Sequence, residues 1–235
     1  MKVLVLRNNI HEGPGILSSI LEDREIVSDI VDFRDLNSLP SLSAYSAVFM
    51  LGGPESANDH TKKMQGALAF VRTIIRSGIP YFGICLGMQV LVKAAGGQVT
   101  RCRTSETGWR DAGREYYRIH VSDYGRSDPL FTGIAGAIPV FQLHGEMVEP
   151  SVGGEVLGFG DECPVQVVKE GRLAYGFQGH IELDEPLLRT LSESSPQLSS
   201  MDSRTMLSDF HAIEEEYTRN GTRIFSNFLD AVQES

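Results

Sequence analysis

Cys85, in the run Tyr-Phe-Gly-Ile-Cys-Leu-Gly-Met-Gln at residues 81–89, is the residue best placed for chemistry. The apolar, β-branched and aromatic residues at 79–84 predict a buried strand, and the spacing at 88–95 predicts a helix. A thiol at such a sharp turn feels the positive end of the helix dipole, which favours the nucleophilic thiolate. The alternative is a buried structural cysteine, because free cysteine is among the most buried residues.

A nucleophilic cysteine needs a base, and the chain has six histidines. His180 differs from the others because it follows a predicted strand and precedes Glu182 by two residues. Residues i and i+2 of an extended segment point the same way, so Glu182 could orient the imidazole of His180. The pattern predicts a triad of Cys85, His180 and Glu182. The alternative is an exposed loop histidine beside an unrelated glutamate.

The turn Leu51-Gly52-Gly53-Pro54 follows another predicted strand, which should lie beside the strand of Cys85. Backbone N–H groups of Gly53 and Leu86 would then face the same point and form an oxyanion site. A Gly-Gly-Pro sequence by itself is typical of an ordinary turn, so its position carries the prediction.

Strand and helix patterns alternate through the first 95 residues. The predicted strands are residues 3–6, 26–33, 47–51 and 79–84, and the predicted helices include residues 15–21 and 61–77. This alternation predicts an α/β fold with a mostly parallel open sheet and helices on both faces. Sites in such folds form at the carboxyl ends of the strands, which is where Cys85 lies.

The middle of the chain changes to short strand patterns, which predict antiparallel additions to the sheet. They are residues 116–121, 138–143, 156–159 and 165–168, followed by a strand at 174–177. A Ser-rich loop at 192–203 precedes one or two amphipathic helices over 205–232, interrupted near Asn220-Gly221. We expect one domain over residues 1–190, with residues 191–235 as a loop and a C-terminal helical extension packed on it.

Composition narrows the function. The chain has 235 residues, and its 21 Lys and Arg against 31 Asp and Glu give a net charge of −10, which argues against nucleic acids and anionic membranes as partners. We expect no secretion signal and no membrane span. Cys85, Cys102 and Cys163 are too widely separated for a disulfide framework or a zinc site. They predict a cytoplasmic protein in which Cys102 and Cys163 are structural.

Three blocks resemble the signatures of the class I (triad-type) glutamine amidotransferases and cover residues 1 to about 185. They are Leu51-Gly-Gly-Pro54, Gly83-Ile-Cys-Leu-Gly-Met-Gln89 and Gly176-Phe-Gln-Gly-His-Ile-Glu182. Gln142-Leu-His-Gly-Glu146 resembles the family's His-Gly substrate loop. Glu106-Thr-Gly-Trp109 resembles the Glu-x-Gly-Trp of stand-alone members similar to the amidotransferase domain of GMP synthetase. The resemblance implies the flavodoxin-like fold of that family for residues 1–190.

The resemblance also implies a reaction. Cys85 would attack the side-chain amide of L-glutamine, releasing ammonia and leaving a γ-glutamyl thioester that water converts to glutamate. His180 would transfer the protons, Glu182 would orient His180, and the N–H groups of Gly53 and Leu86 would hold the oxyanion. The residues expected to bind glutamine are Gly52, Gln89, His144, Gly145 and Glu146. Neither a metal ion nor an organic cofactor is expected.

The expected acceptor of the ammonia is an ATP-dependent, GMP synthetase-like partner subunit, because this chain shows no ATP pyrophosphatase loop. One departure from the family leaves a second hypothesis open. Its usual Gln-Phe-His-Pro-Glu run is replaced by Gln-Gly179-His-Ile181-Glu, and the loss of an aromatic wall would admit a larger leaving group. That change favours a γ-glutamyl peptidase or hydrolase with the same triad. A catalytically silent regulatory subunit is the third hypothesis, against which the complete triad argues.

Overall fold

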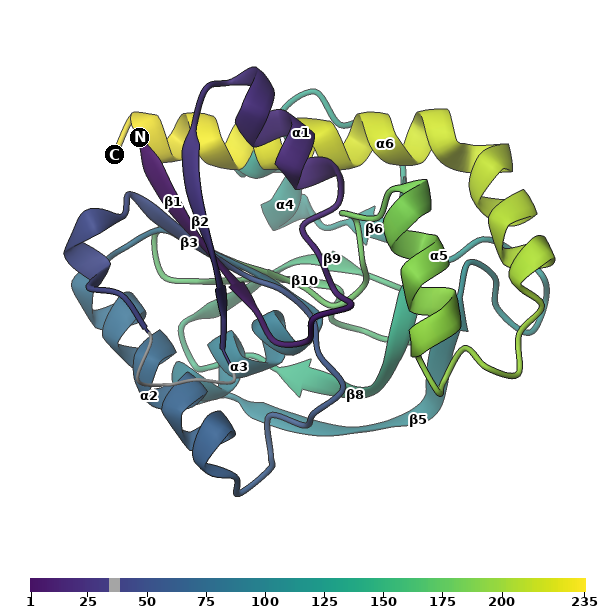
Figure 1. Ribbon diagram of the computed structural model, residues 1–235, viewed down its shortest axis with the longest axis horizontal. Helices are drawn as coiled ribbons and strands as arrows, with labels where there is room; N and C mark the ends of the chain where they lie inside the picture. The colour runs from purple at the N-terminus through teal and green to yellow at the C-terminus, as the bar shows by residue number, and fades with distance from the viewer. Residues whose placement is uncertain (34–38) are drawn as a thin grey trace.

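The computed structural model describes residues 1–33 and 39–235. Its central feature is a nine-stranded sheet with the order β2-β1-β3-β4-β11-β10-β9-β6-β7 (Figure 1). The five neighbours from β2 to β11 pair in parallel, and the remaining strands pair antiparallel. The α/β fold with a parallel sheet core and antiparallel additions from the middle of the chain is therefore confirmed.

The strands of this sheet are short. The parallel strands are β2 (Val27–Asp32), β1 (Lys2–Arg7), β3 (Ala47–Met50), β4 (Tyr81–Ile84) and β11 (Ala174–Phe177). The antiparallel strands are β10 (Val167–Glu170), β9 (Gly154–Phe159), β6 (Arg118–Val121) and β7 (Ile138–Pro139). β3, β4 and β11 are fully buried, because helices cover both faces at the centre of the sheet.

Helices lie on both faces of the sheet, and the alternation of side chains along each strand supplies a core to each face. Val3 and Val5 of β1 point to the face covered by α1 (Ile16–Asp23) and α6 (Ser203–Gln233). Leu4 and Leu6 point to the opposite face, covered by α2 (Lys62–Ser77) and α3 (Leu86–Ala94) (Figure 1). Thr61 caps α2 by accepting a hydrogen bond from the Met64 N–H.

Two antiparallel strands form a separate ribbon, β5 (Gln98–Gly108) and β8 (Gln142–Glu149). The sequence patterns did not predict β5, because its run of Thr, Arg, Cys, Ser and Glu has no apolar alternation. The single strand expected at residues 138–143 is divided between β7 and β8. The short helices are α4 (Asp123–Ser127), η2 (Leu42–Ala44) and η3 (Pro129–Phe131).

The C-terminal segment holds α5 (Glu185–Ser194) and the 31-residue helix α6. The interruption predicted near Asn220-Gly221 is wrong, since α6 continues through both residues. Gly221 serves close packing instead: a β-carbon there would lie 2.4 Å from the carbonyl oxygen of Ile181. The absence of a side chain therefore lets α6 approach the segment that follows β11.

Within residues 1–33 and 39–235, no helix combines the length and the hydropathy needed to cross a membrane.

Candidate active site

Cys85 lies between the end of β4 and the first residue of α3, as the sequence predicts. Its backbone is strained, with φ 51° and ψ −107°, a conformation that side chains disfavour. Close packing holds the turn. The Cys85 N–H donates to the carbonyl of Phe177 at 2.7 Å, and a β-carbon on Gly87 would lie 2.1 Å from the carbonyl oxygen of Met50. The glycine after the cysteine is therefore a packing requirement of the turn.

His180 and Glu182 lie just beyond the end of β11, the strand next to β4. The His180 backbone is extended and exchanges hydrogen bonds with Phe141, at 2.8 and 3.1 Å. The Tyr217 hydroxyl on α6 donates to the His180 carbonyl at 3.1 Å. Nδ1 of His180 is 2.6 Å from Oε1 of Glu182, and both side chains are buried. This is the i, i+2 arrangement that the sequence predicts.

The imidazole of His180 contacts the thiol of Cys85 as well as Glu182. Burial alone would lower the pKa of His180, but the charge of Glu182 and the contact with Cys85 hold it well above its usual range. That environment favours the protonated imidazole. Cys85, His180 and Glu182 are thus neighbours in the order in which a nucleophile, a base and an orienting carboxylate would act.

The Gly52-Gly53 turn lies beside Cys85 and His180, as expected from the order of β3 and β4. A β-carbon on Gly52 would be 3.1 Å from Cε1 of His180 and 2.4 Å from Oε2 of Glu12. Among the residues that the structure describes, the N–H groups of Gly53 and Leu86 have no backbone or side-chain acceptor. Both donors are therefore available to an oxyanion.

Two cavities meet at Cys85. The first, which we call the inner cavity, has a volume of about 270 Å³ and lies toward the β5–β8 ribbon. The second, the outer cavity, has about 420 Å³ and lies toward the loop after α5. Five residues line both cavities: Gly53, Pro54, Cys85, Leu143 and Gln197. A substrate held in one cavity would thus present a leaving group to the other.

Opposite charges line the inner cavity. Arg101 of β5 pairs directly with Glu146 of β8, so both side chains project from the same face of the ribbon. The Ser56 hydroxyl fixes Glu146 by donating to its carboxylate at 2.8 Å. The Gln89 side chain donates to the carbonyl of Glu146 at 3.3 Å, so it also positions this part of β8. A cation and an anion at this spacing suit the two charged groups of an amino acid.

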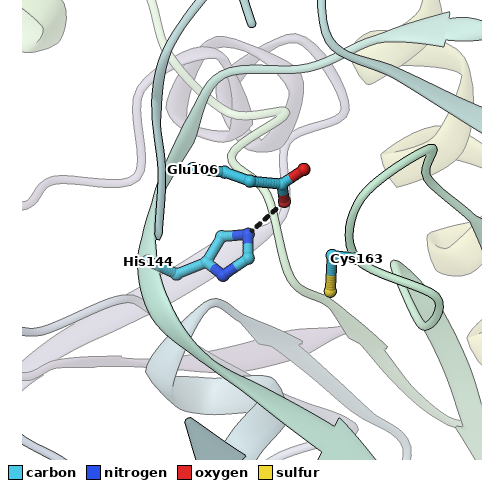
Figure 2. Close-up of side chains that lie close together, drawn as sticks. All are labelled: Glu106, His144 and Cys163. Atoms are coloured by element: carbon cyan, nitrogen blue, oxygen red, sulfur yellow. Dashed lines mark ion pairs between the residues drawn. The ribbon is translucent and has the colours of Figure 1, made fainter. Parts of the chain in front are cut away.

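His144 lies at the back of the inner cavity, where its imidazole is buried against Glu106 (Figure 2). Its Nε2 is 2.8 Å from Oε2 of Glu106, and its Nδ1 donates to the carbonyl of Glu146 at 3.1 Å. Burial would lower the pKa of His144, but contacts with Cys102 and Glu106 raise it to about 9. The protonated ring thus anchors Glu146 of β8, so the residues 144–146 act from a strand of the ribbon and not from a loop.

The same cluster is the one group of metal-ligating side chains in residues 1–33 and 39–235, with atoms of Glu106, His144 and Cys163 within 4.8 Å of one another. The raised pKa of His144, whose Nδ1 faces the carbonyl of Glu146, favours the doubly protonated ring, which has no lone pair for a metal ion. The donor set does not suit a metal in this form.

Gly179 and Ile181 lie outside the cavity walls, contrary to the expectation of a roomier pocket at these positions. A β-carbon on Gly179 would lie 2.3 Å from Cγ2 of Val140, so neighbouring side chains already fill that space. Ile181 is buried in the core beneath α6. The substitutions therefore change packing behind His180 rather than the size of the site.

Several cavity residues were missed by sequence reasoning. Arg101 comes from the unpredicted strand β5, and Glu12 from the loop after β1. The Gln178 amide donates toward the sulfur of Cys85 at 3.9 Å and accepts from Gln89. The loop after α5 adds Ser194 to Gln197. Gln178 lies in the block that carries His180 and Glu182, whereas the other residues have no local motif, so only their position next to Gly52 or Glu146 could have pointed to them.

Comparison with known proteins gives a consistent result. The family model described as glutamine amidotransferase class-I matches residues 17–186. A GMP synthase (glutamine-hydrolyzing) of Listeria innocua is 34% identical over 140 residues, 59% of this chain and 24% of that protein. A separate GMP synthase (glutamine-hydrolyzing) subunit of Sulfurisphaera tokodaii is 29% identical over 60% of this chain and 70% of its own length. This chain thus spans about a quarter of the length of the Listeria protein.

A solved structure of a glutamine amidotransferase from Thermotoga maritima superposes with a TM-score of 0.87, covering 100% of this chain and 99% of that one. The two sequences are 23% identical, so this likeness supports the fold alone.

Proposed function

This chain belongs to the class-I glutamine amidotransferase family, and we propose that it hydrolyses the side-chain amide of L-glutamine through Cys85, His180 and Glu182. The proposal rests on one observation: the strained Cys85 contacts His180, and His180 contacts Glu182, where two cavities meet. The presence of all three residues also argues against the silent regulatory subunit.

The reaction follows from this geometry. His180 takes the thiol proton, and the sulfur of Cys85 attacks the side-chain carbonyl carbon of glutamine. The N–H groups of Gly53 and Leu86 stabilise the oxyanion that forms. The imidazolium then protonates the departing nitrogen, which leaves as ammonia. Water, deprotonated by His180, attacks the γ-glutamyl thioester and releases glutamate.

Recognition of glutamine rests on the inner cavity. Arg101 binds the α-carboxylate of the substrate and Glu146 binds its α-ammonium group. Gln89 and His144 hold the part of β8 that carries Glu146, and Gly145 lies beside it in the cavity wall. Because the inner cavity is slightly below the volume of most ligand pockets, it suits a small substrate.

The proposed acceptor of the ammonia is an ATP-dependent subunit of the GMP synthetase type. Support comes from the Sulfurisphaera relative, which is named as one subunit of a GMP synthase. We also place the protein in the cytoplasm, where reducing conditions keep thiols free; Cys85, Cys102 and Cys163 are all unpaired.

Ammonia release from L-glutamine by the purified chain tests the hydrolysis. We expect turnover that Cys85→Ser abolishes and that Arg101→Ala weakens mainly through a higher KM. Binding of a glutamine-mimicking electrophile to Cys85 separates a slow enzyme from an inert one. Turnover that survives in Cys85→Ser would rule out the proposed nucleophile.

The outer cavity favours a second candidate function, hydrolysis of γ-glutamyl peptides. Its volume of about 420 Å³ is lined by Cys85 but not by Arg101, so it has room for the leaving group of a γ-glutamyl compound bound in the inner cavity. Burial raises the pKa of Glu12 in this cavity, and Glu12 lies where it can meet a departing amine. Faster cleavage of γ-glutamyl dipeptides than of glutamine, lost in Cys85→Ser, would establish this function instead.

A further inference from the structure

Two cysteines outside the proposed active site meet beside His144. Sγ of Cys102, on β5, is 3.6 Å from Nδ1 of His144. Cys163, in the loop between β9 and β10, lies within 4.8 Å of the His144 and Glu106 ligand atoms (Figure 2). Both cysteines also line one small cavity. Residues far apart in the sequence thus bring two thiols together next to the part of β8 that lines the inner cavity.

The two sulfurs differ in their protonation. The hydrogen bond from Cys163, opposed by burial and helped by the imidazolium of His144, lowers the pKa of Cys102 to about 5. The contact with Cys102 and burial raise the pKa of Cys163, whose thiol also lies 3.6 Å from the carbonyl of Val165. A thiolate therefore lies beside a protonated thiol, which is the pairing of an attacking and a resolving cysteine.

Small molecules have a route to this pair. A cavity of about 210 Å³ is lined by both cysteines, and by Arg103 and Glu162. None of its lining residues contributes to the inner or the outer cavity, so a reagent could reach Cys102 without passing Cys85. Cys102 is half-buried and Cys163 is buried, which places the thiolate nearer to solvent.

We propose that Cys102 and Cys163 form a peroxide-reactive dithiol site, and that its oxidation to a disulfide weakens glutamine binding through His144. The Cys102 thiolate attacks one oxygen of hydrogen peroxide, the O–O bond breaks, and hydroxide leaves. Cys163 then attacks the sulfenic sulfur, the S–O bond breaks, and its thiol proton leaves with the hydroxide as water. Two electrons pass from the two cysteines to the peroxide, which ends as one water and one hydroxide, and the hydroxide takes up a proton from solvent.

Only the effect on glutamine rests on the proposed function. Disulfide formation removes the thiolate from Nδ1 of His144 and draws in the loop after β9. That loop leads to Gln166, whose amide donates to Glu106 at 3.2 Å, the ion-pair partner of His144. Both changes act on the residue that anchors Glu146, so we expect a higher KM for glutamine, about three-fold or more.

Mass spectrometry of Cys85→Ser tests the dithiol without any need for turnover, because this variant retains only Cys102 and Cys163. We expect hydrogen peroxide to remove both free thiols and lower the mass by about 2 Da, with a peptide linking the two cysteines. Adding Cys163→Ser should instead let Cys102 accumulate as a sulfenic acid, trapped by dimedone. Adding Cys102→Ser should slow oxidation of Cys163 about ten-fold or more.

Three results would overturn the proposal. The first is oxidation of Cys102 without a link to Cys163, and the second is equal reactivity of the two single thiols. The third is stoichiometric zinc in the reduced protein that is lost in Cys163→Ser, which would make the cluster a metal site.

Kinetics of the wild type then test the link to glutamine. Oxidation of Cys85 lowers kcat by removing active molecules, whereas the disulfide should raise KM in the molecules that remain. A disulfide that forms in the wild type while its KM stays as constant as that of the control Cys102→Ala would overturn the link. Absence of turnover in the untreated protein would instead contradict the proposed function.

Discussion

The backbone of Cys85 is held at φ 51° by its neighbours, although residues with a β-carbon lose about 1 kcal/mol or more there. The strain places the sulfur at the end of β4, in contact with His180, and close packing at Gly87 keeps the turn sharp. The proposed nucleophile is thus positioned at the expense of local stability.

Replacing Cys85 by glycine and by alanine measures this strain. We expect Cys85→Gly to be more stable than Cys85→Ala by about 1 kcal/mol, because glycine adopts positive φ without penalty. Urea unfolding of both variants gives the difference. In the exposed middle of α2, Ala69→Gly should show the opposite sign and lose about 1 kcal/mol. An alanine variant more stable than glycine at position 85 would contradict a strained turn.

Cys102 gives a pH-dependent prediction at the same scale. Its pKa is lowered in the folded state from 9.0 to about 5, so its contribution to stability is present above about pH 9 and lost as pH falls through about 5. The destabilisation caused by Cys102→Ala should therefore be larger at pH 8 than at pH 5. After allowance for solvent screening of this half-buried group, we expect a difference of about 1 kcal/mol.

Unfolding in urea with a thiol reductant at the two pH values measures that difference. Cys163→Ala should show the same trend, because it removes the hydrogen bond that contributes most to the lowered pKa of Cys102. A Cys102→Ala effect that does not grow with pH would contradict a thiolate at this position.

At the scale of elements, the candidate site depends on how α6 packs against the end of β11. Tyr217 of α6 donates to the His180 carbonyl and accepts from the Leu183 N–H, at 3.1 and 3.0 Å. One turn further along, Gly221 allows the helix to touch the carbonyl of Ile181. The helix thus fixes both sides of the segment that carries His180.

Gly221→Ala should push α6 away from this segment. Its new methyl group would meet the Ile181 oxygen and the Ile16 side chain, so we expect a loss of about 1–3 kcal/mol in stability. Glutamine hydrolysis should fall as well, because His180 would shift. Gly153→Ala, in the turn before β9, is the control and should leave Tm unchanged, because a β-carbon there would have no other atom within 4 Å. Thermal unfolding and ammonia release measure the two effects, and an unchanged Tm would contradict the close contact.

At the scale of the whole molecule, the C-terminal segment is part of the core. The match to the family model ends at residue 186, yet α6 contributes apolar residues to the main cluster beneath the sheet. They are Ile224, Phe225, Phe228, Leu229 and Val232. Each buried side chain of this size contributes about 1.5–3 kcal/mol, against a total stability of about 5–15 kcal/mol for a typical domain. We therefore propose that residues 1–190 do not fold alone.

Truncation after residue 202 tests this proposal. We expect the shortened chain to aggregate or to lose cooperative unfolding, because the sheet face that α6 covers would be exposed. Removal of the exposed Glu234 and Ser235 is the control and should leave Tm unchanged. A truncated chain that is monomeric and unfolds cooperatively would show that α6 is only an appendage.

Local patterns were sufficient for the fold class and for the predicted nucleophile. Continuous apolar strands alternating with amphipathic helices can bury their surfaces only in a layered α/β fold, and the strand–Cys85–helix pattern defines a turn by itself. The His180–Glu182 spacing likewise depends on two residues of one extended segment. β5 was missed because its polar run has no alternation, and the helix break at Gly221 was wrong because a packing glycine looks like a terminator.

The sequence by itself therefore determined the features that depend on nearby residues alone. These are the turn at Cys85 and the i, i+2 pair of His180 and Glu182. Only the tertiary structure decided the two cavities, the placement of Arg101 opposite Glu146, and the meeting of Cys102 and Cys163 at His144. Those features join separate strands and loops, and no local pattern specifies which of them become neighbours once the sheet and the ribbon pack together.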